Sequence, residues 1–374
     1  TENSVLVSFD DGISWIPLQG DLPHAPAYWM TVQTHFNDLV VGTYGRGFWI
    51  LDDITPIQQL TDQVLASDFH LFQPRPAYRF LPREGRNSQP GDPAAGENPT
   101  PGASINFYLG QGTEGRGQIL IATESGEHVR TLSTAGTSGL NRVFWDLRYE
   151  SSSTPRLRTS PLEHSHRDIG PSGWRPPPDG GVVRPLAVPG LYQVTLILEG
   201  HEQQSVWLEV LQDPESSAST SDMEAQLNLQ LELRELSDST GALINRIEWT
   251  RKSLDDLEER LTGDPSYNDV VTAGEMLDQL LIELEMGLFD LRLTGGSARQ
   301  DTIRWPRQLW AKLSSLSGYS SGSDDRPSDQ MLEIRTIYRQ RVTDSLLRWA
   351  EIAASNLARF NQILAEQGLP PIIS

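Results

Sequence analysis

Cysteine is absent from the 374 residues of this chain. Disulfide scaffolds, zinc sites built on thiolates and cysteine nucleophiles are therefore excluded. The hydrophobic fraction of 37% and the ten tryptophans nevertheless indicate folded domains with cores of their own. The length is sufficient for two or three such domains.

Positive charge is scarce. The sequence has 30 lysine and arginine residues against 50 aspartate and glutamate residues, which gives a formal net charge of −20, and only Lys252 and Lys312 are lysines. A basic patch that meets phosphates is the usual signature of a nucleic-acid binder, and an anionic membrane surface attracts the same kind of patch. We therefore expect neither nucleic acid nor an anionic membrane surface as a partner.

Long apolar runs and the common catalytic motifs are missing as well. No stretch approaches the length of a membrane-spanning helix, so membrane insertion is not expected. The sequence has no G-x-S-x-G elbow, no phosphate-cradling glycine loop and no H-E-x-x-H motif. Carboxylates are plentiful, but a glycosidase pair is defined by its separation across the sugar, which sequence spacing does not give. We predict no catalytic residue and no cofactor for this chain.

The first chemically specific pattern is a Ser-x-Asp-x-Gly-x-Ser-Trp motif. Residues 4–9 alternate like a β-strand, and a turn with a glycine free to take positive φ follows them. The aspartate of such a motif accepts hydrogen bonds from turn N–H groups, while the tryptophan packs beneath the hairpin. This spacing is that of the Asp-box, for which we predict a structural role. Its signature positions are Ser8, Asp10, Gly12, Ser14 and Trp15.

Three short strands are predicted next, at 28–34, 38–43 and 47–52. In the turn before the last strand, Arg46 lies between two glycines. Its guanidinium either meets a carboxylate ligand bidentately or ties neighbouring structure together, and we favour the second interpretation because such glycines usually serve turn geometry. Tyr44 and Trp49 are interpreted as packing residues, or as sugar platforms if the chain binds a glycan.

The segment NDLVVGTYGRGFWILDD at 37–53, together with the Asp-box, resembles the final blade of large bacterial β-propeller proteins similar to sortilin. These proteins are often labelled BNR-repeat glycosyl hydrolases, and the later parts of the chain follow the same family's order. The resemblance implies that residues 1–55 form the last blade or blades of a propeller. A blade normally has four strands, so we expect the N-terminal portion of the same protein, or a partner chain, to complete them.

The resemblance also bears on function and localisation. It implies an extracellular, periplasmic or cell-surface protein, with a signal peptide on the preceding portion. Sortilin-like propellers bind peptides and proteins, which implies a protein, peptide or glycan ligand here. We favour a non-catalytic region that closes and braces the propeller, because nothing in residues 56–374 forms a catalytic constellation. The alternative is part of a glycoside hydrolase whose active site lies mainly on other blades.

Behind the blade, residues 56–100 are predicted as a connector strap and loop, with an exposed loop at 87–102. Residues 101–212 are predicted as an antiparallel β-sandwich, with Trp145 in its core. Segments 119–148 and 189–200 resemble the Ig-like domain of flagellar hook-capping proteins, which implies an accessory module. The predicted strands are 103–109, 117–123, 129–133, 141–147, 190–199 and 203–210.

A long insertion at 150–189 interrupts this sandwich. It is rich in serine, proline and glycine, and we expect it to be solvated or to pack against the propeller. It also contains His164, His166 and Asp168, which are weak candidates for a metal site because a fourth ligand is not evident. We therefore predict no metal.

From residue 221 the apolar period becomes helical. Leucines and isoleucines recur every three or four residues, and we predict an antiparallel four-helix bundle over 221–366. This heptad seam forms either an intrachain core or an oligomer interface, and we favour the core. The predicted helices are 221–261, 268–293, 305–316 and 328–366. The predicted fold class is therefore β followed by α.

Overall fold

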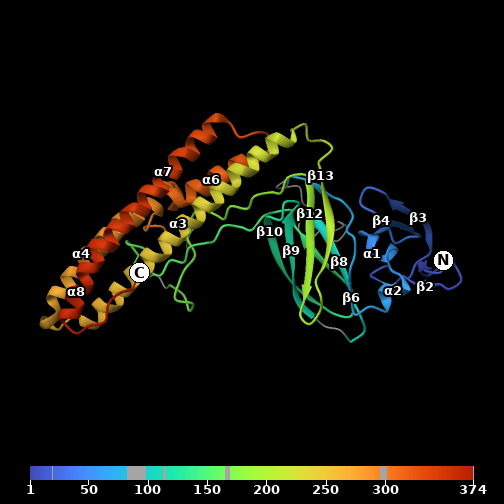
Figure 1. Ribbon diagram of the computed structural model, residues 1–374. Coiled ribbons are helices and arrows are strands. Elements are labelled where there is room, and N and C mark those ends of the chain that lie inside the picture. Colours follow the sequence, from blue (N-terminus) through green and yellow to red (C-terminus); the bar gives the residue numbers. More distant parts are fainter. Residues whose placement is uncertain (19, 82–97, 113–114, 165–168, 295–300, 374) are drawn as a thin grey trace. The chain divides into compact units, whose positions relative to one another are not determined.

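The computed structural model describes residues 1–18, 20–81, 98–112, 115–164, 169–294 and 301–373. Strands occupy the first part of the chain and helices the last part, as predicted (Figure 1). The chain forms two compact units. Unit 1 comprises residues 1–150 and 186–217, and unit 2 comprises residues 151–185 and 218–374.

Unit 1 begins with two small antiparallel sheets. Strands β1 (Leu6–Val7) and β2 (Ile16–Pro17) form a hairpin around the Asp-box turn. Strands β3 (Ala27–Gln33), β4 (Asp38–Thr43) and β5 (Phe48–Leu51) form a three-stranded meander in that order. All three strands lie where the sequence predicts them, because short β-branched and aromatic runs alternate with glycine and asparagine turns.

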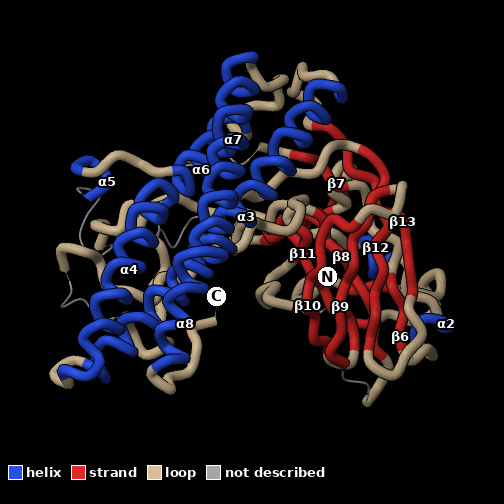
Figure 2. Tube along the Cα trace, turned by 60° about the vertical axis from the view of Figure 1, so that its left-hand side comes forward, coloured by secondary structure: helices blue, strands red, loops and turns tan. Residues whose placement is uncertain are grey.

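Two further sheets build the core of unit 1. One has the order β10-β9-β12-β13-β7, and its neighbouring strands β9, β10 and β12 are visible side by side in Figure 2. The other has the order β11-β8-β6. Their strands are β6 (Phe69–Leu71), β7 (Ala77–Arg79), β8 (Ala103–Leu109), β9 (Gly115–Thr123), β10 (His128–Gly136), β11 (Gly139–Trp145), β12 (Gly190–Leu198) and β13 (Gln204–Gln212).

The segment 56–81 is more than the predicted connector. It contains helices α1 (Thr55–Gln58) and α2 (Asp62–Leu65) and then contributes a strand to each of the two larger sheets. Strand β6 pairs antiparallel with β8, whereas β7 pairs parallel with β13, Val210 lying opposite Ala77. Sequence patterns miss these strands because each has three residues, too few to show a period. Of the predicted exposed loop, residues 87–97 lie outside the described residues.

The core of unit 1 is filled by inward residues of these strands. Trp145 is fully buried, as predicted. Its ring meets Tyr192 edge to face at 5.1 Å, and its Nε1 donates to the Arg148 carbonyl oxygen at 2.9 Å. The indole N–H therefore has a partner inside an apolar core, which a buried tryptophan requires.

Unit 2 is helical, apart from the segment 151–185. The long helix α3 contacts α4, α6 and α7, and their apolar faces share one core. The helices are α3 (Thr220–Leu261), α4 (Asn268–Leu288), α5 (Asp301–Arg304), α6 (Leu309–Ser320), α7 (Asp329–Ile352) and α8 (Ala358–Glu366), and a π-helical turn, Ala353–Leu357, joins α7 to α8. The predicted seam of α3 is buried at Leu233, Leu243, Ile247 and Leu254.

Several helix ends differ from prediction. Helix α3 begins at Thr220 instead of 221 and is capped by Ser219, in a capping box with Asp222. Helix α4 ends at Leu288 instead of 293, because Phe289 takes an extended conformation and continues into the core as irregular chain. In the last long helix Trp349 is buried, whereas Ile337, also apolar, is 45% exposed.

Residues 151–185 of the insertion belong to unit 2, and part of this segment is buried there rather than solvated as expected. Leu157 and Val183 are fully buried within the helical core. The backbone N–H of Ser153 donates to Asp238 at 2.7 Å, and that of Arg156 donates to Asn245 at 2.8 Å. Proline- and glycine-rich composition hides this packing, since irregular chain carries no hydrophobic period.

Candidate functional site

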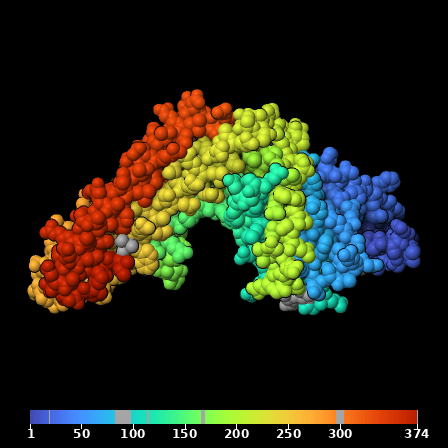
Figure 3. Space-filling view, viewed as in Figure 1, coloured from blue at the N-terminus to red at the C-terminus, as the bar shows by residue number. Residues whose placement is uncertain are grey.

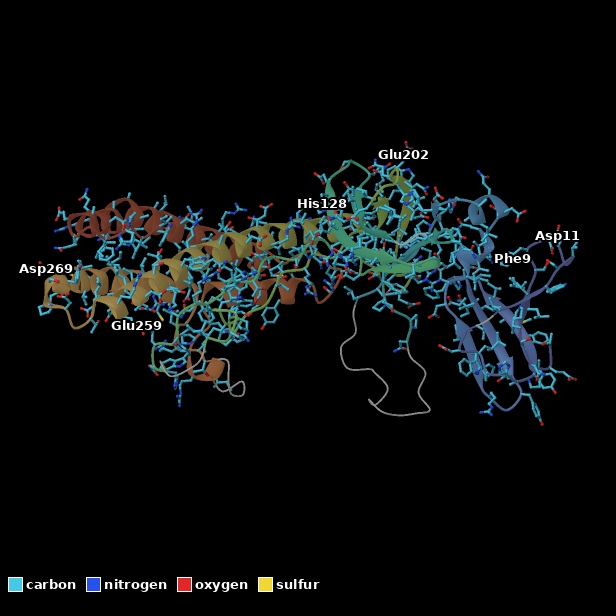
Figure 4. All side chains as sticks on the ribbon, turned by 90° about the horizontal axis from the view of Figure 1, so that it is seen from below. Phe9, Asp11, His128, Glu202, Glu259 and Asp269 are labelled. Carbon is cyan, nitrogen blue, oxygen red and sulfur yellow. The ribbon has the colours of Figure 1, made fainter. Side chains whose placement is uncertain are left out.

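The Asp-box residues close the turn between β1 and β2. The Oδ1 of Asp10 accepts from the Ser14 backbone N–H at 2.8 Å and from the Ser8 hydroxyl at 2.9 Å, while Oδ2 accepts from the Ser14 hydroxyl at 2.5 Å. The Trp15 indole donates to the Gly12 carbonyl oxygen at 3.1 Å. The hydrogen bonds that Asp10 accepts lower its pKa to about 2, and the bond from the Ser14 hydroxyl has the largest effect. Figure 4 labels Phe9 and Asp11 on the same hairpin.

The turn between β4 and β5 is held by its own backbone and by one aromatic ring. Gly45 and Gly47 both have a φ of 75°, and the Trp49 indole donates to the Arg46 carbonyl oxygen at 2.9 Å. The ring of Tyr44 meets Tyr28 edge to face at 5.5 Å. The Arg46 side chain is exposed and has no partner among the described residues, so the two interpretations of Arg46 both stay open.

The three-stranded sheet has two faces, set by its register. Cross-strand partners share a face, so Trp29, Gly42 and Phe48 lie on one face together with Ile50, which we name the Trp29 face. Met30, Val41 and Trp49 lie on the other, the Met30 face, and its remaining apolar members are Val32, Leu39 and Leu51.

Both faces expose large apolar side chains. On the Trp29 face, Trp29 is 74% and Phe48 83% exposed. On the Met30 face, Met30 is 49% exposed, although Val41 beneath it is buried. Side chains stand out from the blue ribbon of these strands in Figure 4, and the dark-blue surface that contains them lies open in Figure 3. A sheet that needs cover on both faces is unusual, because most antiparallel sheets have one apolar and one polar face.

The weak metal candidates are not brought into a described site. His166 and Asp168 lie outside the described residues, and His164 lies in the irregular segment of unit 2. Across the described ranges, no three histidine, aspartate or glutamate side chains gather so as to hold a metal ion.

A buried polar cluster in unit 2 was not predicted. Glu248 and Glu285 are both fully buried. Arg251 donates from Nη1 to Glu285 at 3.1 Å and to the Thr159 hydroxyl at 3.2 Å, and from Nε to Asp278 at 2.9 Å. Burial, and then the neighbouring Glu248, raise the pKa of Glu285 well above its usual value.

This cluster fastens the insertion to the helices. Glu248 accepts from the Thr159 N–H at 2.7 Å and from the Thr159 hydroxyl at 2.9 Å, and it also accepts from the Arg158 N–H. Charged positions at helical spacing usually indicate a solvated face, so sequence alone gave no sign that these carboxylates are buried.

Comparison with known proteins finds no family model and no curated protein that matches this chain. A solved structure described as pT26-6p aligns with 11% identity and a TM-score of 0.14. The alignment covers 67% of this chain and 46% of that one, so the chain spans less than half of that protein's length. Within the described residues, no helix is both long and apolar enough to cross a membrane.

Proposed function

We propose that this chain is the closing and bracing region of a β-propeller protein, and that it acts by assembly rather than by catalysis. In this proposal β3–β5 are blade strands, the two larger sheets of unit 1 are an Ig-like sandwich, and unit 2 is a four-helix bundle. The observation that carries the proposal is the exposure of apolar residues on both faces of the three-stranded sheet.

Two-sided exposure supports one kind of occupant. A sheet that binds a single partner needs one apolar face, whereas a propeller blade is stacked between neighbouring blades and therefore needs two. Within the described residues, β3 and β5 also have no neighbouring strand on their outer edges, which further strands of a blade would cover. We infer that the occupant is β-strand polypeptide of the same propeller, on the preceding portion of the protein or on a partner chain.

The ligand and location follow from the same proposal. The assembled propeller would bind protein, peptide or glycan ligands outside the cell, and the present chain would contribute support. A glycoside hydrolase is not preferred, because no observation among the described residues favours a catalytic carboxylate pair.

Photo-crosslinking tests the occupant directly. Phe48 would be replaced by p-benzoylphenylalanine in cells of the source organism, and the crosslinked peptides would be sequenced. The proposal expects peptides that carry Asp-box spacing, attached at this position. The matched control is the same replacement at Leu191, an exposed apolar position on β12, which should not give those peptides.

Two outcomes would overturn the proposal. One is crosslinking of Phe48 to a second copy of this chain or to no β-propeller sequence. The other is recovery of the chain from its native source as a folded monomer without any further polypeptide, judged by denaturing mass spectrometry and light scattering.

A further inference from the structure

A cavity of about 300 Å³ opens within unit 1, where the ends of β4, β5 and β7 approach β8 and β11. This size is at the lower end of the range for small-molecule sites. One wall is aromatic, formed by Phe36, Tyr78 and Phe80, and three aspartates lie around the same space. None of these residues belongs to the exposed apolar faces of the three-stranded sheet.

The aromatic wall already holds one cation. Tyr78 and Phe80 are stacked with ring centroids 5.7 Å apart, and Phe36 meets Tyr78 edge to face, also at 5.7 Å. The guanidinium carbon of Arg75 lies 5.2 Å from the Phe36 ring centroid. Cations are attracted to such ring faces, so the geometry of this wall suits a positively charged group.

Of the three aspartates, Asp53 has a carboxylate that is engaged by hydrogen bonds within unit 1. It is buried, and its carboxylate accepts from the Ser104 hydroxyl, from the Asn106 amide at 3.3 Å and from the Thr55 backbone N–H at 3.2 Å. The Arg75 Nε lies 3.7 Å from the same carboxylate. Asp53 therefore has a structural role in the wall of the cavity, and its carboxylate has few lone pairs left to accept a hydrogen bond from a ligand.

Asp52 is in the opposite situation. Its carboxylate has no hydrogen bond and no ion pair among the described residues, although it lines the cavity. The Asp52 side chain is exposed at the mouth of the cavity. Desolvation of its carboxyl, and then the nearby charge of Asp38, raise the pKa of Asp52 above its usual value, while Arg142 and Arg75 act in the opposite direction. The Oδ1 of Asp38 accepts a hydrogen bond from the Asp53 backbone N–H at 2.8 Å. A carboxylate so placed gains from an added positive charge.

The positive side chains of the cavity are already engaged. Arg142 donates to the carbonyl oxygens of Asp52 and Asp53, at 2.9 and 2.7 Å, and to the Asn106 side chain at 2.7 Å. Arg75 donates to the Pro76 carbonyl oxygen at 3.1 Å, while its Nε, 3.7 Å from Asp53, has no hydrogen-bond partner among the described residues. Since three aspartates line the cavity against these two arginines, the cavity carries a net negative charge and favours a cation over an anion.

We propose that this cavity binds an organic cation, an alkylammonium or guanidinium group, against the Phe36–Tyr78–Phe80 wall with Asp52 as its counter-ion. The cation is carried either by a free small molecule or by a lysine or arginine side chain of a peptide, since the recognising chemistry is the same. The proposal does not rest on the assembly function, because the aromatic wall and Asp52 are not among the apolar residues of the Trp29 and Met30 faces.

Titration calorimetry on the full chain tests it. The probes are tetramethylammonium, N-acetyl-lysine methylamide and N-acetyl-arginine methylamide, and the negative probes are the neutral norleucine analogue and acetate. We expect saturable binding of at least one cation and none of the negative probes. Asp52→Asn should weaken binding by about tenfold or more, since it removes a charge-assisted contact.

A control variant distinguishes binding in the cavity from a general attraction of cations to this acidic protein. Glu124→Gln removes an exposed carboxylate of the same unit that has no partner among the described residues. It should change the affinity by less than about twofold, because a change of about tenfold requires the loss of a direct charge-assisted contact. Binding should also weaken as pH falls, because Asp52 then becomes protonated. Since Asp52 has no partner to lose, its variant should keep the wild-type circular dichroism spectrum and melting temperature.

The probes identify the source of the cation. Binding of tetramethylammonium alone indicates a small quaternary amine, whereas binding of the amino-acid amides indicates a peptide side chain. The proposal is overturned if no cation binds saturably at about 10 mM, which corresponds to an affinity too weak to be a site. It is equally overturned if Asp52→Asn and Glu124→Gln bind alike, or if acetate binds in place of the cations.

Discussion

Asp10 and Glu285 are carboxyl groups whose surroundings shift their pKa in opposite directions. At Asp10, hydrogen bonds from Ser14 and Ser8 stabilise the charged form on an exposed turn. At Glu285, burial and the nearby Glu248 favour the neutral form. Hydrogen bonding dominates the first case and desolvation the second.

Ser14→Ala should raise the pKa of Asp10 from about 2 towards 3.8, because the Ser14 hydroxyl is the largest cause of the lowered value. A lowered pKa contributes stability above the unfolded value, and this contribution is lost as pH falls through the folded pKa. The variant should therefore lose less stability than the wild type between about pH 4 and about pH 2. Carboxyl ¹³C NMR titration measures the shift. An unchanged Asp10 pKa, or an equal effect of Ser125→Ala, would contradict the assignment.

Glu285→Gln tests the neutral state of the buried glutamate. A raised pKa contributes stability below the unfolded pKa, which is 4.5, and that contribution is lost as pH rises through the folded pKa. Glutamine does not titrate, so the wild type should lose stability relative to the variant as pH rises above the unfolded value of 4.5. Urea unfolding across this range measures the difference. A difference that is flat with pH, or that matches exposed Glu275→Gln on the same helix, would show that Glu285 is not held neutral.

Arg251→Met should destabilise unit 2 by about 3–5 kcal/mol, because it leaves the buried carboxylate of Glu248, and the carboxylate of Asp278, without their positive partner. Arg251 is 4% exposed and contacts Glu285, Asp278 and Thr159. Urea unfolding followed by helical circular dichroism measures the loss. Arg359→Met, at an exposed position on α8, should change stability by less than about 0.5 kcal/mol. Similar losses from both variants would argue against the cluster.

At the scale of elements, the segment 151–185 behaves as part of the helical core. Gly180 has a φ of 86°, and a Cβ there would lie 2.7 Å from the Trp310 ring on α6. The next residue, Gly181, donates its N–H to the Ser314 hydroxyl at 3.1 Å. The irregular chain therefore follows the helix surface closely enough to require a residue without a side chain.

Gly180→Ala should lower the stability of unit 2 by at least about 1–2 kcal/mol, since alanine at positive φ costs that much before the contact with Trp310 is counted. Gly181→Ala is the matched control, because no heavy atom lies within 4 Å of its added Cβ. Thermal unfolding of the two variants checks the difference. Equal melting temperatures would mean that the segment does not pack on α6.

The elements differ in how far the sequence predicts them. The seam of α3 and the strands β3–β5 were predicted correctly, because long helical periods and short alternating runs with glycine turns are local signals. The three-residue strands β6 and β7 and the packing of Leu157 were not, because they depend on partners more than 30 residues away. The cavity lined by Asp52 and the aromatic wall likewise joins residues from separate segments of the chain, which spacing cannot reveal.

At the scale of the whole molecule, the two open faces of the three-stranded sheet dominate the surface chemistry of unit 1. The double variant Trp29→Ser with Phe48→Ser should bind less of an apolar fluorescent dye and self-associate less, because it removes the most exposed aromatic rings of the Trp29 face. Dye fluorescence and light scattering measure both effects. Tyr319→Ser with Met276→Ser, two exposed positions on helices, is the control. Equal reductions from both pairs would show that the sheet has no special role.

The parallel pairing of β7 with β13 has a consequence for biosynthesis. It joins residues 77–79 to residues 210–212, and between them the chain leaves for unit 2 and returns. During translation, unit 1 therefore cannot complete its larger sheet until residue 212 has left the ribosome. Residues 151–185 cannot pack until the helices of 218–374 have been synthesised after them. Neither unit is a contiguous piece of sequence, so a simple truncation between the strands and the helices would leave both incomplete.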